Sequence, residues 1–432
     1  MPTDDTPRTE IGHPFWWIAA PRPDSQPDAL PERVDVLVIG SGYTGSSAAL
    51  TLAKAGREVL ILDKRRAGEG ASSRNGGICS GNLKPSLGAL TEKLGRERAL
   101  AIYREGISAR KFVGERIQEE KIDCDYKMTG RFTGVTHPRH LEKVKREVDV
   151  LNTQLDIPAW FVEKQNVSDE LGTELFLGGY VREDIGGLHP GKYQLGLLGA
   201  ATRAGAVFQG GVTVQSVERD GARHRIVTSS GTIVADHVIA ATNGYLDSYL
   251  PWLQKRVVPI PSQIIVTARI SPNLMKQLMP KGRMCGTTDR LFNYYRPTPD
   301  GERIMFGGRV YNDNPDPMIR GGKLKNRMLQ MFPELGDTPI ERSWFGYTGF
   351  TMDFMPKIGV HDGIHYACGY NGSGVIWASY FGHRIAQQVM GLPEGKTAFD
   401  GLPFPVIPFF SGKPWFLGTM VRLYGIGDAL GR

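Results

Sequence analysis

Cysteine is scarce in this chain, and long hydrophobic runs are missing from it. The four cysteines among 432 residues are widely separated, and no two of them form a Cys-x-x-Cys pair. This spacing argues against a zinc site or a disulfide framework, and it predicts reduced thiols in a cytoplasmic protein without a metal site. No apolar run reaches the length of about 18 residues that a membrane-spanning helix needs, so none is expected.

A concentrated basic region is also missing, although the formal net charge is +7. Lysines and arginines are scattered among acidic residues, and the densest basic stretch, Arg139–Arg146, also contains Glu142. Such a stretch is typical of the solvated face of a helix. Because the sequence offers no basic stripe with an aromatic platform, we expect no nucleic-acid partner.

Glycine, by contrast, is abundant, with 54 residues, and one group of glycines lies between a strand and a helix. Val34–Ile39 has the β-branched pattern of a strand, residues 44–55 that of a helix, and residues 58–62 that of a second buried strand. These elements predict a βαβ unit with parallel strands. Residues 1–32 are expected to form an extended arm, in which Phe15–Ile18 packs on the domain surface.

The glycines complete a Gly-x-Gly-x-x-Gly motif, Gly40-Ser41-Gly42-Tyr43-Thr44-Gly45. In this motif Gly40 permits the tight turn, Gly42 lets a pyrophosphate approach the backbone, and Gly45 lets helix and strand pack closely. The helix N-terminus then offers free N–H groups to the phosphates. Asp63, at the end of the second strand, is placed to accept hydrogen bonds from ribose hydroxyls. The sequence therefore predicts a dinucleotide site.

Two further glycine-rich segments favour a flavin over a nicotinamide. Gly68–Gly77 is a loop of small and polar residues whose backbone suits a large flat ring, with a flexible surface loop as the alternative. Gly369–Val375 joins a strand to a helix, and the helix N-terminus would place N–H donors against the electron-rich pyrimidine end of a reduced flavin. No second Gly-x-Gly-x-x-Gly motif occurs, which argues against a separate NAD(P)H domain. We therefore expect FAD as the cofactor.

The rest of the sequence alternates between helical and antiparallel patterns. Helical patterns cover residues 91–120, 138–155 and 190–204, residues 257–310 are rich in strands, and a final helix is expected from Val375 to Met390. This mixture predicts two domains that interleave along the chain. We expect a FAD-binding domain at 33–90, 188–250 and 345–395, a substrate domain at 91–187 and 251–344, an N-terminal arm at 1–32, and a C-terminal tail with a short helix at 396–432.

Several short motifs, taken in order, resemble the D-amino acid oxidase superfamily of FAD-dependent oxidoreductases. They are VIGSGYTGSSAAL, GASSRNGG, LHPGKY, VIAATNGYL, YYRPTPDG with FGGR, the segment from Trp344 to Gly359, and GYNGSGV. The similarity runs through roughly residues 13–425 and is greatest to the glycine oxidase, sarcosine oxidase and gamma-glutamylputrescine oxidase branch. It implies a mixed α/β fold, in which a Rossmann-like FAD domain is assembled from discontinuous segments and a second domain lays a mixed or antiparallel sheet over the flavin.

The resemblance also assigns residues to the cofactor. Val214 falls where the family contacts the adenine, and Asn371–Val375 fall beside the pyrimidine end of the flavin. With the motifs above, the expected FAD-binding residues are Gly40, Gly42, Tyr43, Thr44, Gly45, Asp63, Lys64, Ser72, Ser73, Asn75, Gly76, Gly77, Val214, Asn371, Gly372, Ser373, Gly374 and Val375.

Two positions depart from the family pattern. Gly346 stands where sarcosine oxidases carry the cysteine that holds the flavin, so FAD is expected to bind noncovalently. Thr348 stands where glycine oxidases carry an arginine for the substrate carboxylate, and threonine cannot make that bidentate contact. Thr348 therefore favours an amine over a simple α-amino acid as the substrate.

The reaction that the resemblance implies moves a hydride from the carbon next to a neutral amine to flavin N5. The imine is hydrolysed to an aldehyde or keto product, and oxygen reoxidises the flavin to give hydrogen peroxide. On the substrate side we expect Tyr294, Tyr295, Arg296 and Thr348, with Arg309 as a further arginine for a remote carboxylate. The tyrosines could cage an alkylammonium, and packing as half-buried strand residues is the alternative.

Other interpretations stay open beside the favoured one, a gamma-glutamylputrescine oxidase-like enzyme that oxidises a small amine or amino acid. A dehydrogenase that passes electrons to a membrane quinone would give Pro414–Leu417 a role, with the C-terminal tail in peripheral contact with a membrane. A noncatalytic FAD-binding subunit of a larger complex and an RNA-modifying flavoprotein are the others. His189, before Pro190 at a helix start, is interpreted as structural rather than catalytic.

Overall fold

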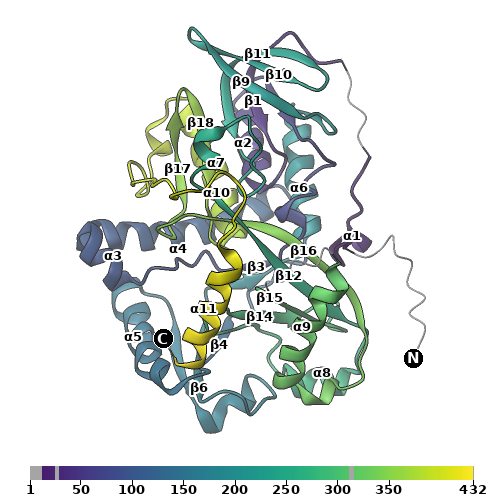
Figure 1. The fold of residues 1–432 in the computed structure, drawn as a ribbon, viewed down its shortest axis with the longest axis vertical. Helices are drawn as coiled ribbons and strands as arrows, with labels where there is room; N and C mark the ends of the chain where they lie inside the picture. The colour runs from purple at the N-terminus through teal and green to yellow at the C-terminus, as the bar shows by residue number, and fades with distance from the viewer. Residues whose placement is uncertain (1–11, 25–28, 311–315, 432) are drawn as a thin grey trace.

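The computed structural model describes residues 12–24, 29–310 and 316–431, and two large sheets dominate it (Figure 1). The first sheet has eight strands in the order β17-β18-β11-β1-β2-β8, with the β9–β10 hairpin paired to β11. Its strands are β1 (Arg33–Ile39), β2 (Val59–Leu62), β8 (Val207–Gln209), β9 (Val214–Asp220), β10 (Arg223–Thr228), β11 (Gly231–Ala240), β17 (Lys357–His361) and β18 (Ile364–Cys368).

The parallel centre of the first sheet is buried on both faces. β1 pairs in parallel with β2 on one side and with β11 on the other. Along β1, Val36 and Val38 pack into a layer of helices, whereas Leu37 and Ile39 pack into the layer that holds the β9–β10 hairpin. Such two-sided burial explains why β1 is almost continuously hydrophobic. The layer of helices contains α2 (Tyr43–Lys54), α6 (Pro190–Arg203) and α10 (Gly374–Val389).

The second sheet also has eight strands, in the order β16-β12-β15-β14-β13-β4-β6-β5. Its pairs are antiparallel, apart from the parallel pair of β13 and β4. Helices α8 and α9 pack against one of its faces. These elements are β4 (Arg131–Gly134), β5 (Ala159–Glu163), β6 (Gly178–Arg182), β12 (Val258–Thr267), β13 (Met284–Thr287), β14 (Asn293–Pro297), β15 (Ile304–Gly308), β16 (Ile340–Phe350), α8 (Pro272–Leu278) and α9 (Pro317–Met331).

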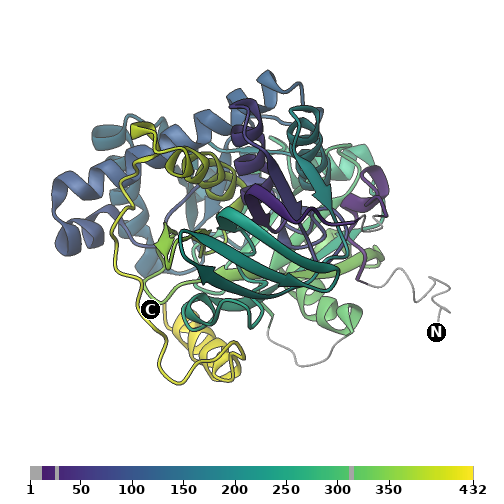
Figure 2. The same ribbon diagram turned by 90° about the horizontal axis from the view of Figure 1, so that it is seen from above.

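The two sheets confirm the expected mixed α/β fold, with a βαβ unit completed by strands from distant segments. The expected domain boundaries remain a proposal. Strand β16 runs across the boundary expected between residues 344 and 345. The remaining elements used below are α1 (Trp16–Ala19), η2 (Ala71–Ser73), β3 (Ile78–Cys79), β7 (Gly186–Gly187), α7 (Pro251–Gln254) and α11 (Leu417–Ala429). Figure 2 shows α11 at the rim of the molecule, apart from α1. No helix of the described ranges combines the length and apolar character that crossing a membrane requires.

Some helices differ from their expected form. The expected helix at 91–120 is two helices, α3 (Leu87–Leu94) and α4 (Arg96–Glu119), because Gly95, with a φ of 83°, ends the first. The expected helix at 138–155 starts with a 3₁₀ turn, and α5 proper is Leu141–Leu155. Helix α9 was not expected, although Asp316 at its N-cap and Pro317 at its first position are ordinary start signals.

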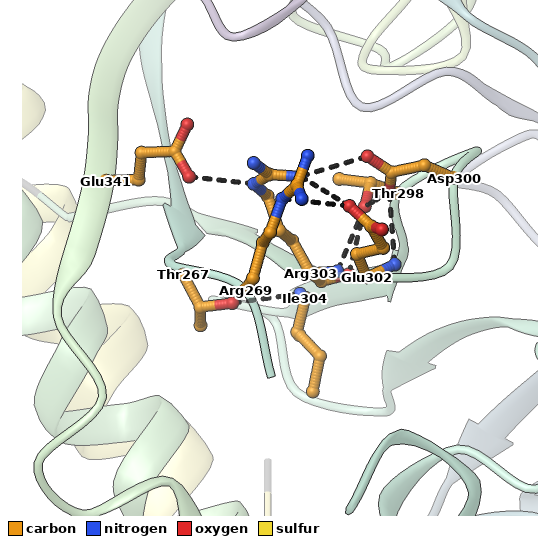
Figure 3. Close-up of polar contacts among 8 residues, drawn as sticks. All are labelled: Thr267, Arg269, Thr298, Asp300, Glu302, Arg303, Ile304 and Glu341. Carbon is orange, nitrogen blue, oxygen red and sulfur yellow. Dashed lines mark hydrogen bonds and ion pairs between the residues drawn. The ribbon is translucent and has the colours of Figure 1, made fainter. Parts of the chain in front are cut away.

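A charged network around Arg303 braces the outer end of the second sheet (Figure 3). The Arg303 guanidinium donates to Glu341 of β16 at 2.7 Å and to Asp300 of the β14–β15 turn at 2.9 Å. Glu302 lies 3.5 Å away, and the Arg303 side chain is only 10% exposed. The nearby Arg269 also reaches Glu302, at 3.0 Å, but its side chain is 70% exposed. Arg303 and Arg269 therefore both pair with Glu302, but only Arg303 is buried.

We expect Arg303→Leu to lower the free energy of unfolding by about 1.5–3 kcal/mol, because it leaves Glu341 and Asp300 without their charged donor. The matched control is Arg269→Leu, whose exposed ion pair is worth about 0–1 kcal/mol. Urea denaturation of both variants measures the difference. Equal losses in the two variants would show that the network does not brace the sheet.

Candidate functional site

A cavity of about 730 Å³ lies where the two sheets meet. From the first sheet, Ile39 and Leu62 reach it at the carboxyl ends of β1 and β2. From the second sheet, Ser262, Ile264 and Tyr294 line it. The cavity thus joins the glycine motif to one face of the second sheet, and it lies at the strand ends where open α/β sheets bind ligands.

The three motif glycines have different surroundings. Gly40 has a φ of 105°, and a Cβ there would lie 3.0 Å from the Ala241 carbonyl oxygen. Gly42 has an ordinary φ of −69°, but its Cβ would lie 2.8 Å from the Ser72 hydroxyl oxygen. Gly45 does not line the cavity, and its Cβ would overlap the Gly40 carbonyl oxygen. Gly40 and Gly42 therefore keep backbone open to the cavity, while Gly45 permits close packing behind it.

Two helix N-termini face the cavity without side-chain caps. Gly42 and Ser373, the N-cap residues of α2 and α10, make no cap bond to their own helices. The Ser373 hydroxyl instead donates to the Asn82 carbonyl at 2.7 Å. Apart from the Tyr43 N–H of α2, which donates to the Ser72 hydroxyl, such first turns present free N–H groups and a partial positive charge. Two such ends fit a ligand with a diphosphate and an electron-rich ring, as in a flavin dinucleotide.

One direct hydrogen bond joins the segments at these two N-termini. The Thr44 hydroxyl of α2 lies 2.7 Å from the Tyr370 hydroxyl, which precedes α10. Asn371 follows with a φ of 52°, and its side-chain oxygen accepts from the Thr351 N–H at 3.1 Å. Its own N–H donates to the Gly349 carbonyl at 3.1 Å. The loop before α10 is thereby fixed against α2 and β16. The loop and helix residues Asn371, Gly372, Ser373, Gly374 and Val375 all line the cavity.

Asp63 lies at the end of β2, where a ribose is expected. Its carboxylate accepts from the Ser41 N–H at 2.9 Å, from the Ser41 hydroxyl at 2.7 Å, and from the N–H two residues later at 3.0 Å. A carboxylate has about four acceptor positions, so one remains for a ribose hydroxyl. Burial raises the pKa of Asp63. Lys64 pairs with Asp247 at 2.7 Å, and Val214 lies on the cavity wall nearby.

The glycine-rich loop at 68–77 borders the cavity on one side. Ser72, Asn75 and Gly76 line the cavity, whereas Ser73 and Gly77 lie behind it. The Ser72 hydroxyl accepts from the Tyr43 N–H at 2.9 Å, which ties the loop to the start of α2. The Asn75 amide donates to the Tyr43 hydroxyl at 3.2 Å and to the Ser72 carbonyl at 3.1 Å. Tyr43 itself is buried, so its backbone rather than its ring contributes to the motif.

The N-terminal arm supports this loop from behind, which the sequence did not predict. Trp16 is fully buried, and its indole N–H donates to the Asn75 carbonyl at 2.8 Å. The Trp17 indole N–H donates to the Ser73 hydroxyl at 2.9 Å. The segment Phe15–Ile18 thus packs onto the domain as expected, with both tryptophans buried in the contact. The expected extended conformation is wrong for Trp16–Ala19, which forms the short helix α1. The sequence feature that could have predicted this contact is the pair of adjacent tryptophans in a proline-rich arm.

The expected substrate residues of β14 face different ways, because side chains alternate along a strand. Tyr294 faces the cavity, and its hydroxyl lies 3.0 Å from the Ser262 hydroxyl. Tyr295 faces the helices on the other side, fully buried and stacked on Phe306. Arg296 is buried beneath the glycine-rich loop, where it donates to backbone carbonyls. Tyr295 and Arg296 therefore do not fit the substrate role expected of them.

Thr348, Gly346 and Arg309 also line the cavity. A Cβ on Gly346 would lie 3.2 Å from Arg74 Cβ, and none of the four cysteines lines the cavity. Two cations missed by the sequence analysis, Lys84 and Arg131, share the wall with Arg309. Lys84 comes from the loop after β3, and Arg131 begins β4.

His189 has a structural position, as expected from the sequence. Its ring nitrogen Nδ1 accepts from the Lys192 N–H at 3.1 Å, which caps α6. The ring lies 5.0 Å from that of Trp16, centre to centre. Burial lowers the pKa of His189 to about 4. The ring is therefore neutral near pH 7 and held away from the cavity wall.

The outer end of the cavity is covered by α11. The Asp428 carboxylate accepts from the N–H groups of Arg290 and Leu291, at 2.7 and 3.0 Å. Arg139 donates to the Leu430 carbonyl at 3.0 Å. Polar contacts therefore hold α11 in place, since within the helix only Leu417 is buried.

Comparison with known proteins agrees with this geometry. A family model described as FAD dependent oxidoreductase matches residues 35–388. Gamma-glutamylputrescine oxidoreductase of Escherichia coli (strain K12) is 32% identical over 415 residues, which cover 94% of this chain and 95% of that protein. The probable oxidoreductase OrdL of Rhizobium meliloti (strain 1021) is 31% identical over 394 residues, 90% of each chain.

Solved structures share the fold at lower identity. Glycine oxidase from Geobacillus kaustophilus superposes with a TM-score of 0.72 at 20% identity, covering 88% of this chain and 100% of that one. L-Proline dehydrogenase from P. horikoshii gives a TM-score of 0.70 at 20% identity, covering 86% of this chain and 96% of that one. At such identity the likeness extends to the fold alone.

We expect Gly42→Val to yield folded protein without a bound dinucleotide, because the new side chain would meet Ser72 and fill the space beside the α2 N-terminus. The backbone of Gly42 lies in a region open to any residue, so the effect is one of space. Gly322→Val is the control, since nothing lies within 4 Å of its Cβ position. Cofactor absorbance per chain measures occupancy, and circular dichroism checks the fold. Full occupancy in Gly42→Val would contradict the assignment.

Proposed function

The chain belongs to the family of FAD-dependent oxidoreductases, and from that premise we propose that it oxidises the carbon–nitrogen bond of a small amine. The observation that carries the proposal is the continuity of the cavity. Its wall runs from the glycine motif, past the loop before α10, to Tyr294 on the second sheet. A cofactor held at the two helix N-termini and a substrate held by the second sheet would therefore share one cavity.

FAD, when bound, supplies the acceptor for a hydride from the carbon next to the amine nitrogen. The residues proposed to hold it are those of the α2 and α10 N-termini, the glycine-rich loop, Asp63, Lys64 and Val214. Transfer from a neutral amine needs no dedicated acid or base, so the task of the chain is to position the amine and exclude water. The imine product would then be hydrolysed in water.

Tyr294 is the side chain we propose to position the amine. Its ring lies against Gly76, whose Cβ would be 2.9 Å from the ring edge, so a larger residue there would displace it. Burial raises the pKa of Tyr294 to about 12, and Ser262 holds its hydroxyl. Near pH 7 the side chain is a neutral phenol, which can orient a substrate by hydrogen bonding without taking its proton.

Oxygen is the electron acceptor we propose, with hydrogen peroxide as its product, in a protein of the cytoplasm. A membrane quinone is the second candidate, and the C-terminal segment favours it. Phe409 is 93% exposed and Trp415 is 70% exposed there, on a stretch that precedes α11. Oxygen consumption with an amine substrate distinguishes the two acceptors, because a quinone-linked enzyme would consume little oxygen without added quinone.

We expect FAD to leave the protein intact when the yellow protein is precipitated with acid. The reason is that Gly346 offers no nucleophile and that no cysteine lines the cavity. The flavin absorbance of pellet and supernatant measures the outcome. Yellow colour that stays with the precipitated chain would contradict noncovalent binding.

We expect primary or secondary alkylamines, including acylated polyamines, to reduce the flavin anaerobically faster than glycine, sarcosine or D-alanine do. Thr348 stands where the arginine clamp for an α-carboxylate would be, and the loss of such a clamp costs roughly 1.5–3 kcal/mol, or about ten- to a hundredfold in affinity. Stopped-flow bleaching of the flavin band compares the two sets. Faster bleaching by the small amino acids, by about tenfold or more, would refute the amine proposal.

A further inference from the structure

Helix α11 has its polar and apolar sides inverted relative to an ordinary surface helix. Its inner side meets the body through the Asp428 carboxylate, which accepts from two backbone N–H groups of the loop before β14. The opposite side carries Leu423, Ile426 and the C-cap residue Leu430, with exposed fractions of 59%, 60% and 50%. Their spacing of three and four residues places them on one side of the helix, which a surface helix ordinarily turns toward the core. This apolar side is therefore directed away from the body.

Two aromatic side chains beside the start of α11 extend the apolar side. Phe409 is 93% exposed and Trp415 is 70% exposed. The Trp415 indole N–H donates to the Phe409 carbonyl at 3.1 Å, so these two residues lie together. Next to them, Phe410 and Leu417 are buried in one apolar cluster, which joins this segment to the first turn of α11. We call the exposed set the tail surface: Phe409, Trp415, Leu423, Ile426 and Leu430.

Phe409 is held in a costly conformation. Its φ is 57°, in the left-handed region that a bulky residue seldom adopts, and almost all of the residue is exposed. Because the ring is not buried against the chain, no packing of that ring offsets the strain in its backbone. A partner that covers the ring would supply the missing burial.

The charged side chains around the tail surface are mostly basic. From residue 401 to residue 431, the chain has two cations, Lys413 and Arg422, and both are exposed. The one acid in this segment is Asp428, whose carboxylate is engaged by the body. Two more exposed cations border the other end of α11. The Arg290 guanidinium lies 5.7 Å from a tyrosine ring of the helix, and Arg139 donates to a backbone carbonyl at its end.

The carboxylates that neighbour these arginines in the sequence are engaged within the chain. Asp289, beside Arg290, accepts from a threonine hydroxyl at 2.6 Å. Glu142, three residues after Arg139, pairs with Lys145 at 3.6 Å. The tail surface therefore presents apolar side chains with a basic border. An anionic lipid surface complements this combination, whereas a second copy docked through the same surface would bring like charges together.

We propose that the tail surface docks the protein on an anionic lipid surface, with α11 lying in the plane of the interface. The helix has 13 residues, whereas crossing a bilayer takes about 20, so its apolar side would enter only the headgroup boundary. A tryptophan suits that boundary, because its ring is apolar and its N–H is polar. Asp428 and Gly431 also line the cavity, so docking brings the outer end of the cavity to the lipid. Docking of this kind goes beyond the amine oxidation proposed above and depends on neither electron acceptor.

Flotation with lipid vesicles tests the docking on the FAD-loaded protein, without substrate. We expect wild type to bind vesicles of phosphatidylcholine and phosphatidylglycerol about tenfold or more tightly than vesicles of phosphatidylcholine alone. Added salt should reduce this difference, because it screens the charges. Lys413→Gln and Arg422→Gln should each weaken binding to the anionic vesicles about fivefold. Lys111→Gln is the control, because it removes the same charge from a side chain that is 76% exposed on α4.

Two further variants remove apolar area from the tail surface. Phe409→Asn should weaken vesicle binding about tenfold or more, because it deletes the ring. Urea denaturation should show equal or higher stability for this variant, since asparagine adopts the left-handed region more readily. Ile426→Ser should weaken binding about five- to tenfold. Its control is Ile18→Ser, which should bind as wild type does, because Ile18 is 56% exposed on α1, apart from α11 (Figure 2).

The proposal is overturned if wild type does not bind the anionic vesicles, or if Phe409→Asn and Ile426→Ser bind them as tightly as wild type does. Equal binding to the two kinds of vesicle would also overturn it. Sedimentation equilibrium without lipid tests the other occupant, a second copy. If wild type dimerises, Phe409→Asn stays monomeric and neither binds vesicles, the tail surface joins two copies and lipid docking is refuted. The amine function is judged separately, by flavin reduction, so the failure of one proposal leaves the other standing.

Discussion

The hydrogen bond between Thr44 and Tyr370 joins two helix N-termini that are far apart in the sequence, and the rest of the site depends on their closeness. Behind it, α2 and α10 pack with little space between their backbones. A Cβ on Gly382 would overlap the Thr44 carbonyl oxygen, and the Ser47 hydroxyl donates to the Ser379 carbonyl at 2.6 Å. Two positive helix ends are thereby held beside one cavity, an arrangement that a negatively charged ligand stabilises.

What could be predicted from the sequence was local in the chain. The turn at Gly40–Gly45, the strand before it and the loop before α10 each carry their signal within a few residues, and the structure brings all of them to one cavity. The direction of Tyr295 could not be predicted in this way, because a shift of one residue turns a strand side chain to the opposite face. Only the pairing of β14 with its neighbours sets which tyrosine meets the cavity.

Contacts between distant segments were the other part that the sequence did not give. Trp16 and Trp17 contact the glycine-rich loop across more than fifty positions of chain. Lys84 and Arg309 meet at Phe292 although different elements carry them. In the sequence these cations are indistinguishable from solvated surface charges. What sets them apart is their surroundings in the structure. These are aromatic rings and other cations, with no ion-paired carboxylate among the described residues.

The order in which the site is assembled has a consequence for synthesis of the protein. The ribosome makes α2 early and α10 late, so a nascent chain carries the first cofactor anchor long before it has the second. Until α10 emerges, the face of α2 around Ser47 and Ala48 lacks the helix that covers it. A chain released before α10 would therefore expose apolar surface and lack a closed cofactor site, which marks it for aggregation or proteolysis. A chain that has bound its cofactor is therefore one in which translation has passed β18, the last of the sheet strands.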